Sequence, residues 1–109
     1  MRATVIHGEG DVRYEEVADP QILTPTDAIV RVVAACVCGS DLWPYRGIID
    51  VPAGKQVGHE IVGVVEQIGD NVQNVRVGDF VIAPFYNCCM HCVNCLAGVT
   101  TSCVTGGWW

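Results

Sequence analysis

Four cysteines near the end of the sequence constrain this chain more than any other feature. Cys89, Cys92 and Cys95 are separated by two residues each, and seven residues separate Cys95 from Cys103. Two-residue gaps let consecutive thiolates turn back onto one ion, and four thiolates at about 2.3 Å form a closed tetrahedral zinc site. Because no position remains for a substrate, the pattern predicts a structural zinc lobe over residues 88–104. The loop inside it has little to bury, so metal binding would supply most of its order.

Two other uses of cysteine fit the pattern less well. Disulfide bonds are disfavoured because seven cysteines are an odd number and the sequence opens without an export signal. Iron–sulfur runs of the ferredoxin type also begin with two-residue gaps, but they continue with three residues and Cys-Pro, whereas Val104 follows Cys103 here. Cys88 lies outside the spacing and is interpreted as a spare thiol. His91 is interpreted as a solvent-facing residue rather than a ligand.

Composition limits the size of the core and the kind of partner. The 109 residues suffice for one domain with a modest core, and a chain that is 50% hydrophobic and 17% charged is not a disordered tail. A net charge of −6 argues against nucleic acid or an anionic membrane as partner. No apolar run is long enough for a membrane-spanning helix, so none is expected. Free thiols without a signal peptide predict a reducing, cytoplasmic location.

The hydrophobic pattern is β throughout. Only residues 40–45 suggest a helical turn, and Pro44 keeps that turn short. Several short strands separated by Gly and Pro predict a small barrel or sandwich. No Gly-x-Gly-x-x-Gly run leads into a helix, so no dinucleotide-binding fold is expected within this sequence. Extended runs are expected at residues 3–6, 12–17, 28–37 (buried on both faces), 60–68 and 80–83.

A second group of metal-capable residues lies at two predicted strand ends. Cys38 follows the run 28–37, and His59 and Glu60 open the run 60–68. Cysteine, histidine and carboxylate form the ligand set of catalytic zinc, in which three protein ligands leave one position open. A lone histidine before a strand is more often simply hydrogen-bonded. Spacing alone therefore leaves both interpretations open.

Taken in chain order, four segments resemble the N-terminal part of zinc-dependent alcohol dehydrogenases of the medium-chain dehydrogenase/reductase family. They are Cys38-Gly39-Ser40-Asp41, Gly58-His59-Glu60, Val77-Gly78-Asp79-Phe80-Val81 and the four-cysteine lobe. The resemblance extends over essentially the whole chain. It implies a mainly β fold: a GroES-like, partly open β-barrel over residues 1–109 that carries the structural zinc lobe.

The resemblance also implies a role for each residue of the two groups. Cys38 and His59 would ligate the catalytic zinc, and Glu60 would be a close second ligand or exchange partner for metal-bound water. Asp41 would orient a ligand. Ser40 would hydrogen-bond the substrate hydroxyl and begin a proton relay. The structural zinc would be held by Cys89, Cys92, Cys95 and Cys103.

The implied activity is oxidation of a small-molecule alcohol to an aldehyde or ketone, with reduction of NAD or NADP, by an enzyme that is a homo-oligomer at full length. Trp43 and Tyr45 either wall an apolar substrate pocket or are packing residues. Family chains are roughly three times as long, with a Rossmann domain after this region. We therefore interpret the end at Trp108-Trp109 as a truncation, and expect an inactive portion that binds one zinc tightly and the second weakly.

Two functions of other classes stay open on the sequence. One is a standalone GroES-like module, stabilised by one zinc, that acts in assembly. It predicts a mobile polar loop for a chaperonin partner, which the sequence does not show, and it leaves Cys38, Ser40, Asp41 and His59 unexplained. The other is a thiol redox or metal-storage protein, which would use Cys36, Cys38, Cys88 and Cys89.

Overall fold

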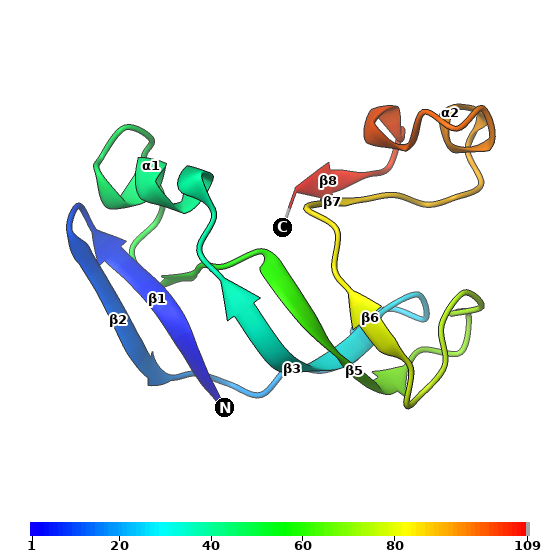
Figure 1. Cartoon of the computed structure of the whole chain (residues 1–109), viewed down its shortest axis with the longest axis horizontal. Helices are drawn as coiled ribbons and strands as arrows, with labels where there is room; N and C mark the ends of the chain where they lie inside the picture. Colours follow the sequence, from blue (N-terminus) through cyan, green and yellow to red (C-terminus); the bar gives the residue numbers. More distant parts are fainter. Residues whose placement is uncertain (109) are drawn as a thin grey trace.

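The computed structural model describes residues 1–108, with only the backbone at Trp108, and the fold is mainly β (Figure 1). The first of three sheets has the strand order β2–β1–β4, formed by Asp11–Glu16, Arg2–Gly8 and Lys55–Gln56. Strands β1 and β2 are antiparallel. Val5 and Ile6 of β1 are fully buried and, with Val65, are the largest completely buried side chains of the described residues.

The second sheet brings the two halves of the second metal-capable group together. Its order is β3–β5–β6, formed by Ala28–Cys36, Glu60–Ile68 and Phe80–Ile82. β3 and β5 are antiparallel, and their register sets Cys36 opposite Glu60. The end of β3, which leads to Cys38, therefore lies beside the start of β5, which follows His59.

The expectation that residues 28–37 are buried on both faces is wrong. The strand forms as predicted, but Val32 and Val33 on its two faces are 50% and 56% exposed. Alternation along a strand sends consecutive side chains to opposite faces, so at Val32 and Val33 neither face is fully covered by another part of residues 1–108. A β-branched run predicts the strand, whereas burial depends on what packs against it.

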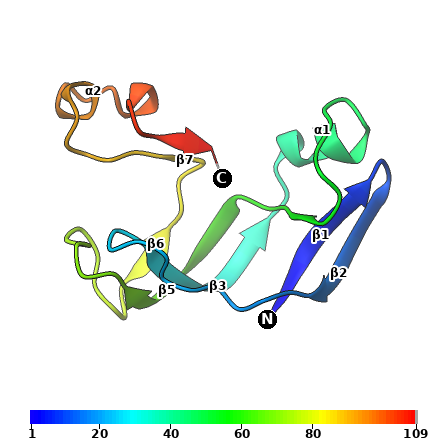
Figure 2. The same ribbon diagram turned by 180° about the vertical axis from the view of Figure 1, so that it is seen from behind.

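The third sheet carries the cysteine lobe. It pairs β7 (Tyr86–Asn87) with β8 (Gly107–Trp108). Between these strands the chain forms the short helix α2 (Val93–Leu96) and the 3-10 turn η2 (Thr100–Ser102). In Figure 1 this hairpin and its lobe, yellow to red, stand apart from the first sheet, and Figure 2 shows the same separation from behind.

The remaining helical residues follow Cys38. The 3-10 turn η1 (Gly39–Asp41) leads into α1 (Leu42–Tyr45), which lies beside β1. This confirms the helical turn expected at residues 40–45. The three sheets are not hydrogen-bonded into one closed ring within residues 1–108, which agrees with a partly open barrel.

No helix among residues 1–108 is both long and apolar enough to cross a membrane. Trp109, on which the interpretation of the chain end partly relied, lies outside the described residues.

Candidate metal centres

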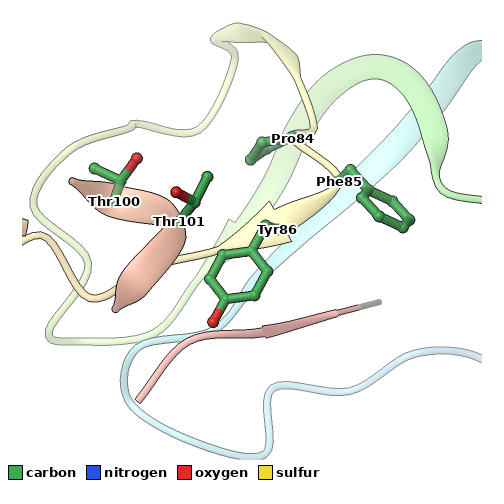
Figure 3. A pocket seen from close by; sticks show the side chains of 5 residues that line it. All are labelled: Pro84, Phe85, Tyr86, Thr100 and Thr101. Atoms are coloured by element: carbon green, nitrogen blue, oxygen red, sulfur yellow. The ribbon is translucent and has the colours of Figure 1, made fainter. Parts of the chain in front are cut away.

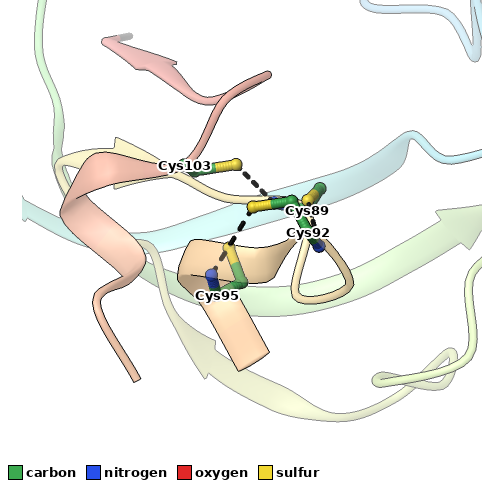
Figure 4. A group of neighbouring side chains, drawn as sticks. All are labelled: Cys89, Cys92, Cys95 and Cys103. Atoms are coloured by element: carbon green, nitrogen blue, oxygen red, sulfur yellow. Dashed lines mark hydrogen bonds between the residues drawn. The ribbon is translucent and has the colours of Figure 1, made fainter. Parts of the chain in front are cut away.

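The four predicted cysteines converge in the lobe (Figure 4). The Sγ atoms of Cys89, Cys92, Cys95 and Cys103 all lie within 4.8 Å of one another. Tetrahedral zinc with bonds of about 2.3 Å holds its sulfurs about 3.8 Å apart. The thiols are therefore already close to the arrangement that one zinc ion requires.

Backbone amides of the lobe point at these sulfurs. The N–H groups of Cys89, Cys92 and Cys95 donate to the Sγ atoms of Cys103, Cys89 and Cys92, at 3.3, 3.3 and 3.5 Å. Such donors favour thiolates over thiols. Met90 sits inside the first two-residue gap with a positive φ of 61°, so the chain makes a tight turn there.

The thiols differ in how readily they lose a proton. The backbone N–H of His91 lowers the pKa of the Cys89 thiol to about 5, and that of Cys89 lowers the pKa of the Cys103 thiol. Burial raises the pKa of Cys95 to about 12. Four thiolates this close repel one another, so a divalent cation is needed for all four to ionise together. The donor set therefore fits zinc.

The second group also converges. One ligand atom from each of Cys38, His59 and Glu60 lies within 4.8 Å of the others. The Nε2 atom of His59 is 3.8 Å from Oε1 of Glu60. The hydroxyl of Ser40 lies between two of these groups, 3.3 Å from Cys38 Sγ and 3.3 Å from His59 Nε2. One thiol, one imidazole and one carboxylate at this separation fit a zinc site with an open position.

Asp41 connects the two chain segments of this group. Its Oδ2 accepts a hydrogen bond from the backbone N–H of Cys38 at 2.8 Å, and its Oδ1 lies 3.3 Å from Nδ1 of His59. One carboxylate therefore fixes the turn after β3 and faces the ring of His59. The Ser40 hydroxyl and backbone amide lower the pKa of the Cys38 thiol, which favours the thiolate as a ligand.

Gly58 gives the chain its direction at this point. Its φ of +112° lies in a region that side-chain-bearing residues rarely adopt. The turn at Gly58 leads directly into His59, whose side chain is only 11% exposed. The backbone conformation therefore requires glycine before the histidine, and this turn determines the direction in which the chain enters β5.

Sequence reasoning missed Phe85. Its ring packs against that of His59 in a tilted arrangement, with centroids 4.5 Å apart and planes at 56°. Phe85 follows Pro84, in a segment that spacing rules do not single out, and it lies 26 residues from His59 in the sequence numbering. No local pattern could have found this contact, because it depends on where β6 leaves the second sheet.

A cavity of about 350 Å³ lies beside this segment, under the lobe (Figure 3). It is lined by Pro84, Phe85, Tyr86, Thr100 and Thr101. In Figure 3 the ring of Phe85 is turned away from Thr100 and Thr101. Phe85 therefore borders this cavity, and its ring is also 4.5 Å from the ring of His59, centroid to centroid.

Other predicted residues lie outside both groups. Cys88 does not share the four-cysteine arrangement, and its Sγ is 3.3 Å from Sδ of Met90. His91 is exposed, as expected. Trp43 and Tyr45 are 53% and 42% exposed, so neither is a buried packing residue in the described part of the chain.

Comparison with known proteins decides the family. The family described as "Alcohol dehydrogenase GroES-like domain" matches residues 24–109. The chain belongs to this family. The resemblance drawn from the motifs and the GroES-like fold class are thereby confirmed.

Curated relatives agree with this assignment. The chain is 37% identical over 103 residues to zinc-type alcohol dehydrogenase B of Aspergillus flavus, covering 94% of this chain and 24% of that protein. It is 36% identical over 110 residues to a glutathione-independent formaldehyde dehydrogenase of Pseudomonas aeruginosa, covering 95% and 28%. The GroES-like chain thus spans about a quarter of the length of these relatives.

Solved structures share the fold of the described residues. Alcohol dehydrogenase TADH from Thermus sp. ATN1 superposes with a TM-score of 0.92 at 41% identity, covering 100% of this chain and 32% of that one. A zinc-dependent alcohol dehydrogenase 2 from Streptococcus pneumonia gives a TM-score of 0.88 at 35% identity, covering 100% and 32%. The mainly β arrangement with its cysteine lobe is therefore that of a zinc-type alcohol dehydrogenase domain.

Proposed function

We propose that this chain is the N-terminal catalytic-domain portion of a zinc-dependent alcohol dehydrogenase. The full-length enzyme would oxidise a small-molecule alcohol to an aldehyde or ketone with NAD or NADP. One observation carries the proposal: the Ser40 hydroxyl lies 3.3 Å from both Cys38 Sγ and His59 Nε2, inside a thiol–imidazole–carboxylate group. A hydroxyl beside two metal-capable side chains is within reach of an alcohol oxygen that binds at the same centre.

Each residue has a role in this proposal. Cys38 and His59 would hold the catalytic zinc, and Glu60, whose side chain is 44% exposed, would be a close second ligand or exchange partner for metal-bound water. Asp41 fixes the orientation of the His59 ring through Nδ1. When bound, the metal would supply Lewis acidity toward an alcohol oxygen, and a nicotinamide dinucleotide would accept the hydride.

Ser40 handles the proton. Its hydroxyl is both a donor and an acceptor, so it can accept the proton of the alcohol at Oγ while its own proton passes to a neighbouring acceptor or to water. Its half-buried position keeps it within reach of solvent. The alcohol thus loses one proton through Ser40 and one hydride to the dinucleotide.

The four-cysteine centre has a structural role in the proposal. Four protein ligands leave no position for substrate. The lobe would hold β7 and β8 together, and its zinc would be retained more tightly than the catalytic zinc. Free thiols in both groups require a reducing compartment, so we place the enzyme in the cytoplasm. From the family resemblance, we also propose that the full-length enzyme is a homo-oligomer.

Cobalt titration of the 109-residue chain tests the proposal. Co²⁺ can replace zinc, and its absorption spectrum reports the ligands. The thiolate-to-cobalt charge-transfer band is more intense for a four-thiolate site than for a one-thiolate site. We expect two equivalents, the first at the four-cysteine centre, and a change in the spectrum of the second when a primary alcohol is added. His59→Ala should abolish the second equivalent, while the matched His7→Ala variant retains it. The proposal would be refuted if two equivalents of Co²⁺ bind but their absorption spectra change neither on addition of alcohol nor in His59→Ala.

The chain by itself should not turn over. Neither a Gly-x-Gly-x-x-Gly run nor another dinucleotide-binding motif occurs in the sequence. We therefore expect no alcohol-dependent rise in nicotinamide absorbance from the 109-residue chain with NAD or NADP. Such a rise would contradict the proposal that the dinucleotide is bound by another part of a longer protein.

A further inference from the structure

The His59 ring is held at both nitrogens and on one face. Asp41 Oδ1 lies 3.3 Å from Nδ1, and Ser40 Oγ lies 3.3 Å from Nε2. Both contacts lie at the edge of the ring, at its two nitrogens. The Phe85 ring covers the face, with centroids 4.5 Å apart and a tilt of 56°. Aromatic rings at this separation attract one another in a defined orientation. Phe85 thus adds an aromatic contact to the two polar contacts that orient the His59 ring.

Phe85 belongs to the cysteine lobe by chain connection. It directly precedes β7, and Cys89 comes two residues after the end of that strand. β7 pairs with β8, setting Asn87 opposite Gly107, and Oδ1 of Asn87 accepts a hydrogen bond of 2.6 Å from the N–H of Gly107. The connection between these two strands contains all four cysteines. Whatever closes the lobe therefore also holds β7, and with it Phe85.

The lobe depends on its cysteines for closure. Within residues 88–106 the only buried side chains are Cys95 and Cys103, at 6% and 7% exposure. Both are predicted ligands, so the lobe has no apolar core apart from the groups that would bind the ion. Without the ion, a connection this long between two-residue strands has a large loop entropy and little to offset it. A filled four-cysteine centre would fix β7, whereas an empty one would release it.

We propose that Phe85 is a positioning residue that couples the four-cysteine centre to the His59 ring, so that filling the first centre strengthens metal binding at Cys38, His59 and Glu60. The inference rests on the proposed function, since it takes both groups as zinc sites. It adds a dependence of one centre on the other, carried by the contact between the Phe85 and His59 rings. Linkage requires the reverse as well: an occupied second site strengthens retention at the first by the same factor.

Competition titration with a chromophoric chelator tests the coupling on the 109-residue chain. In Phe85→Leu, which keeps an apolar side chain but loses the ring, the affinity of the second site for Zn²⁺ should fall about 5- to 10-fold, within the range of aromatic pair contacts. Phe85→Tyr retains the ring and should restore affinity. The matched control is Phe80→Leu, because Phe80 is the other phenylalanine of the chain and is 63% exposed on β6. It should leave both sites unchanged.

A second comparison separates coupling from simple packing. Cys103→Ser weakens the four-cysteine centre, and it should lower the affinity of the second site in the wild-type background but add little in the Phe85→Leu background. Circular dichroism at each titration point confirms that the β-sheets of every variant persist. If Phe85→Leu leaves the second-site affinity unchanged, or Cys103→Ser acts equally in both backgrounds, the coupling is overturned while the proposed function stands. If the wild-type chain binds one equivalent only, both are overturned.

Discussion

At the scale of single residues, Asp41 is the side chain on which the second metal group most depends. It accepts from the backbone N–H of Cys38 and faces Nδ1 of His59, so it ties together the proposed ligands at the adjoining ends of β3 and β5. A carboxylate opposite a ligating histidine sets its tautomer and raises its basicity. The neighbouring hydroxyl of Ser40 contacts the other nitrogen of the same ring.

Asp41→Asn should therefore weaken Zn²⁺ binding at Cys38, His59 and Glu60 by about 10- to 100-fold, because the amide carries no charge to stabilise a ligating imidazole. The affinity of the four-cysteine centre measured with the second site empty should be unchanged. Competition with a chromophoric chelator measures both affinities. Asp50→Asn, in an exposed loop away from both groups, is the control. Equal affinities in the two variants would show that Asp41 does not support the site.

Asp27 stabilises the turn before β3. Its carboxylate accepts from the Thr24 hydroxyl at 2.7 Å and from the backbone N–H groups of Thr24 and Leu23 at 2.8 and 2.9 Å. These bonds, the Thr24 hydroxyl first, lower the pKa of Asp27 below its usual value of 3.8. Because the pKa is lower in the folded chain, the turn gains stability above pH 3.8, and this stability is lost as the pH falls through the folded-state pKa.

Thr24→Val removes the largest contribution and should raise the pKa of the Asp27 carboxyl toward its usual value. Carbon-detected NMR of the side-chain carboxyl across an acid titration reports this shift. Thr26→Val is the matched control, since Thr26 contacts the Thr24 hydroxyl at 3.0 Å and has no hydrogen bond to the carboxylate. A pKa of Asp27 that is the same in wild type and Thr24→Val would contradict the assigned cause.

At the scale of elements, the register of β3 on β5 decides where the second metal group forms. Gly63 lets the two strands approach: a Cβ there would lie 2.5 Å from the carbonyl oxygen of Arg31 and 2.6 Å from Cγ1 of Val30. Across the same ladder the Arg31 guanidinium bonds Glu66 at 2.9 Å in a largely exposed pair. Exposed pairs of this kind add little stability. The register therefore depends on the close backbone approach rather than on charge.

Gly63→Ala should destabilise the chain by about 1–3 kcal/mol, because the added methyl group forces β5 away from β3. Urea unfolding of the zinc-loaded chain gives the change in the free energy of unfolding. Gly8→Ala is the control, since no heavy atom lies within 4 Å of a Cβ at that position. Equal stability of Gly63→Ala and wild type would mean that the strands can separate at no cost.

At the scale of the whole molecule, the described residues divide into sheets that are stabilised by buried apolar side chains and a lobe that has almost none. The first two sheets contain the fully buried Val5, Ile6 and Val65, whereas the lobe buries little except its own cysteines. Many large apolar side chains stay exposed, among them Val33 on the edge strand β3. Such an edge favours association with further polypeptide.

Removal of metal by a chelator should therefore melt the lobe selectively. We expect faster hydrogen exchange at the amides of β7, α2 and β8, and unchanged protection in β3 and β5, because only the former depend on the ion for closure. Mass spectrometry of exchanged peptides resolves these segments. Re-addition of Zn²⁺ should restore protection, which controls for irreversible oxidation of the thiols. Loss of protection spread evenly over all strands would mean that the lobe and the sheets unfold as one unit.

The sequence by itself determined the four-cysteine cluster and most strands, because cysteine spacing and β-branched apolar runs are local constraints, whereas the group of Cys38, His59 and Glu60 was predicted only through the family resemblance. Cys89 to Cys103 converge as their spacing predicts, and β5 covers residues 60–68 as expected. Only the tertiary structure decided that Phe85 packs against His59 and that Val32 and Val33 of β3 are exposed. Both outcomes depend on which distant segment packs against a residue. Sheet register and strand exit set that packing, and no local pattern encodes them.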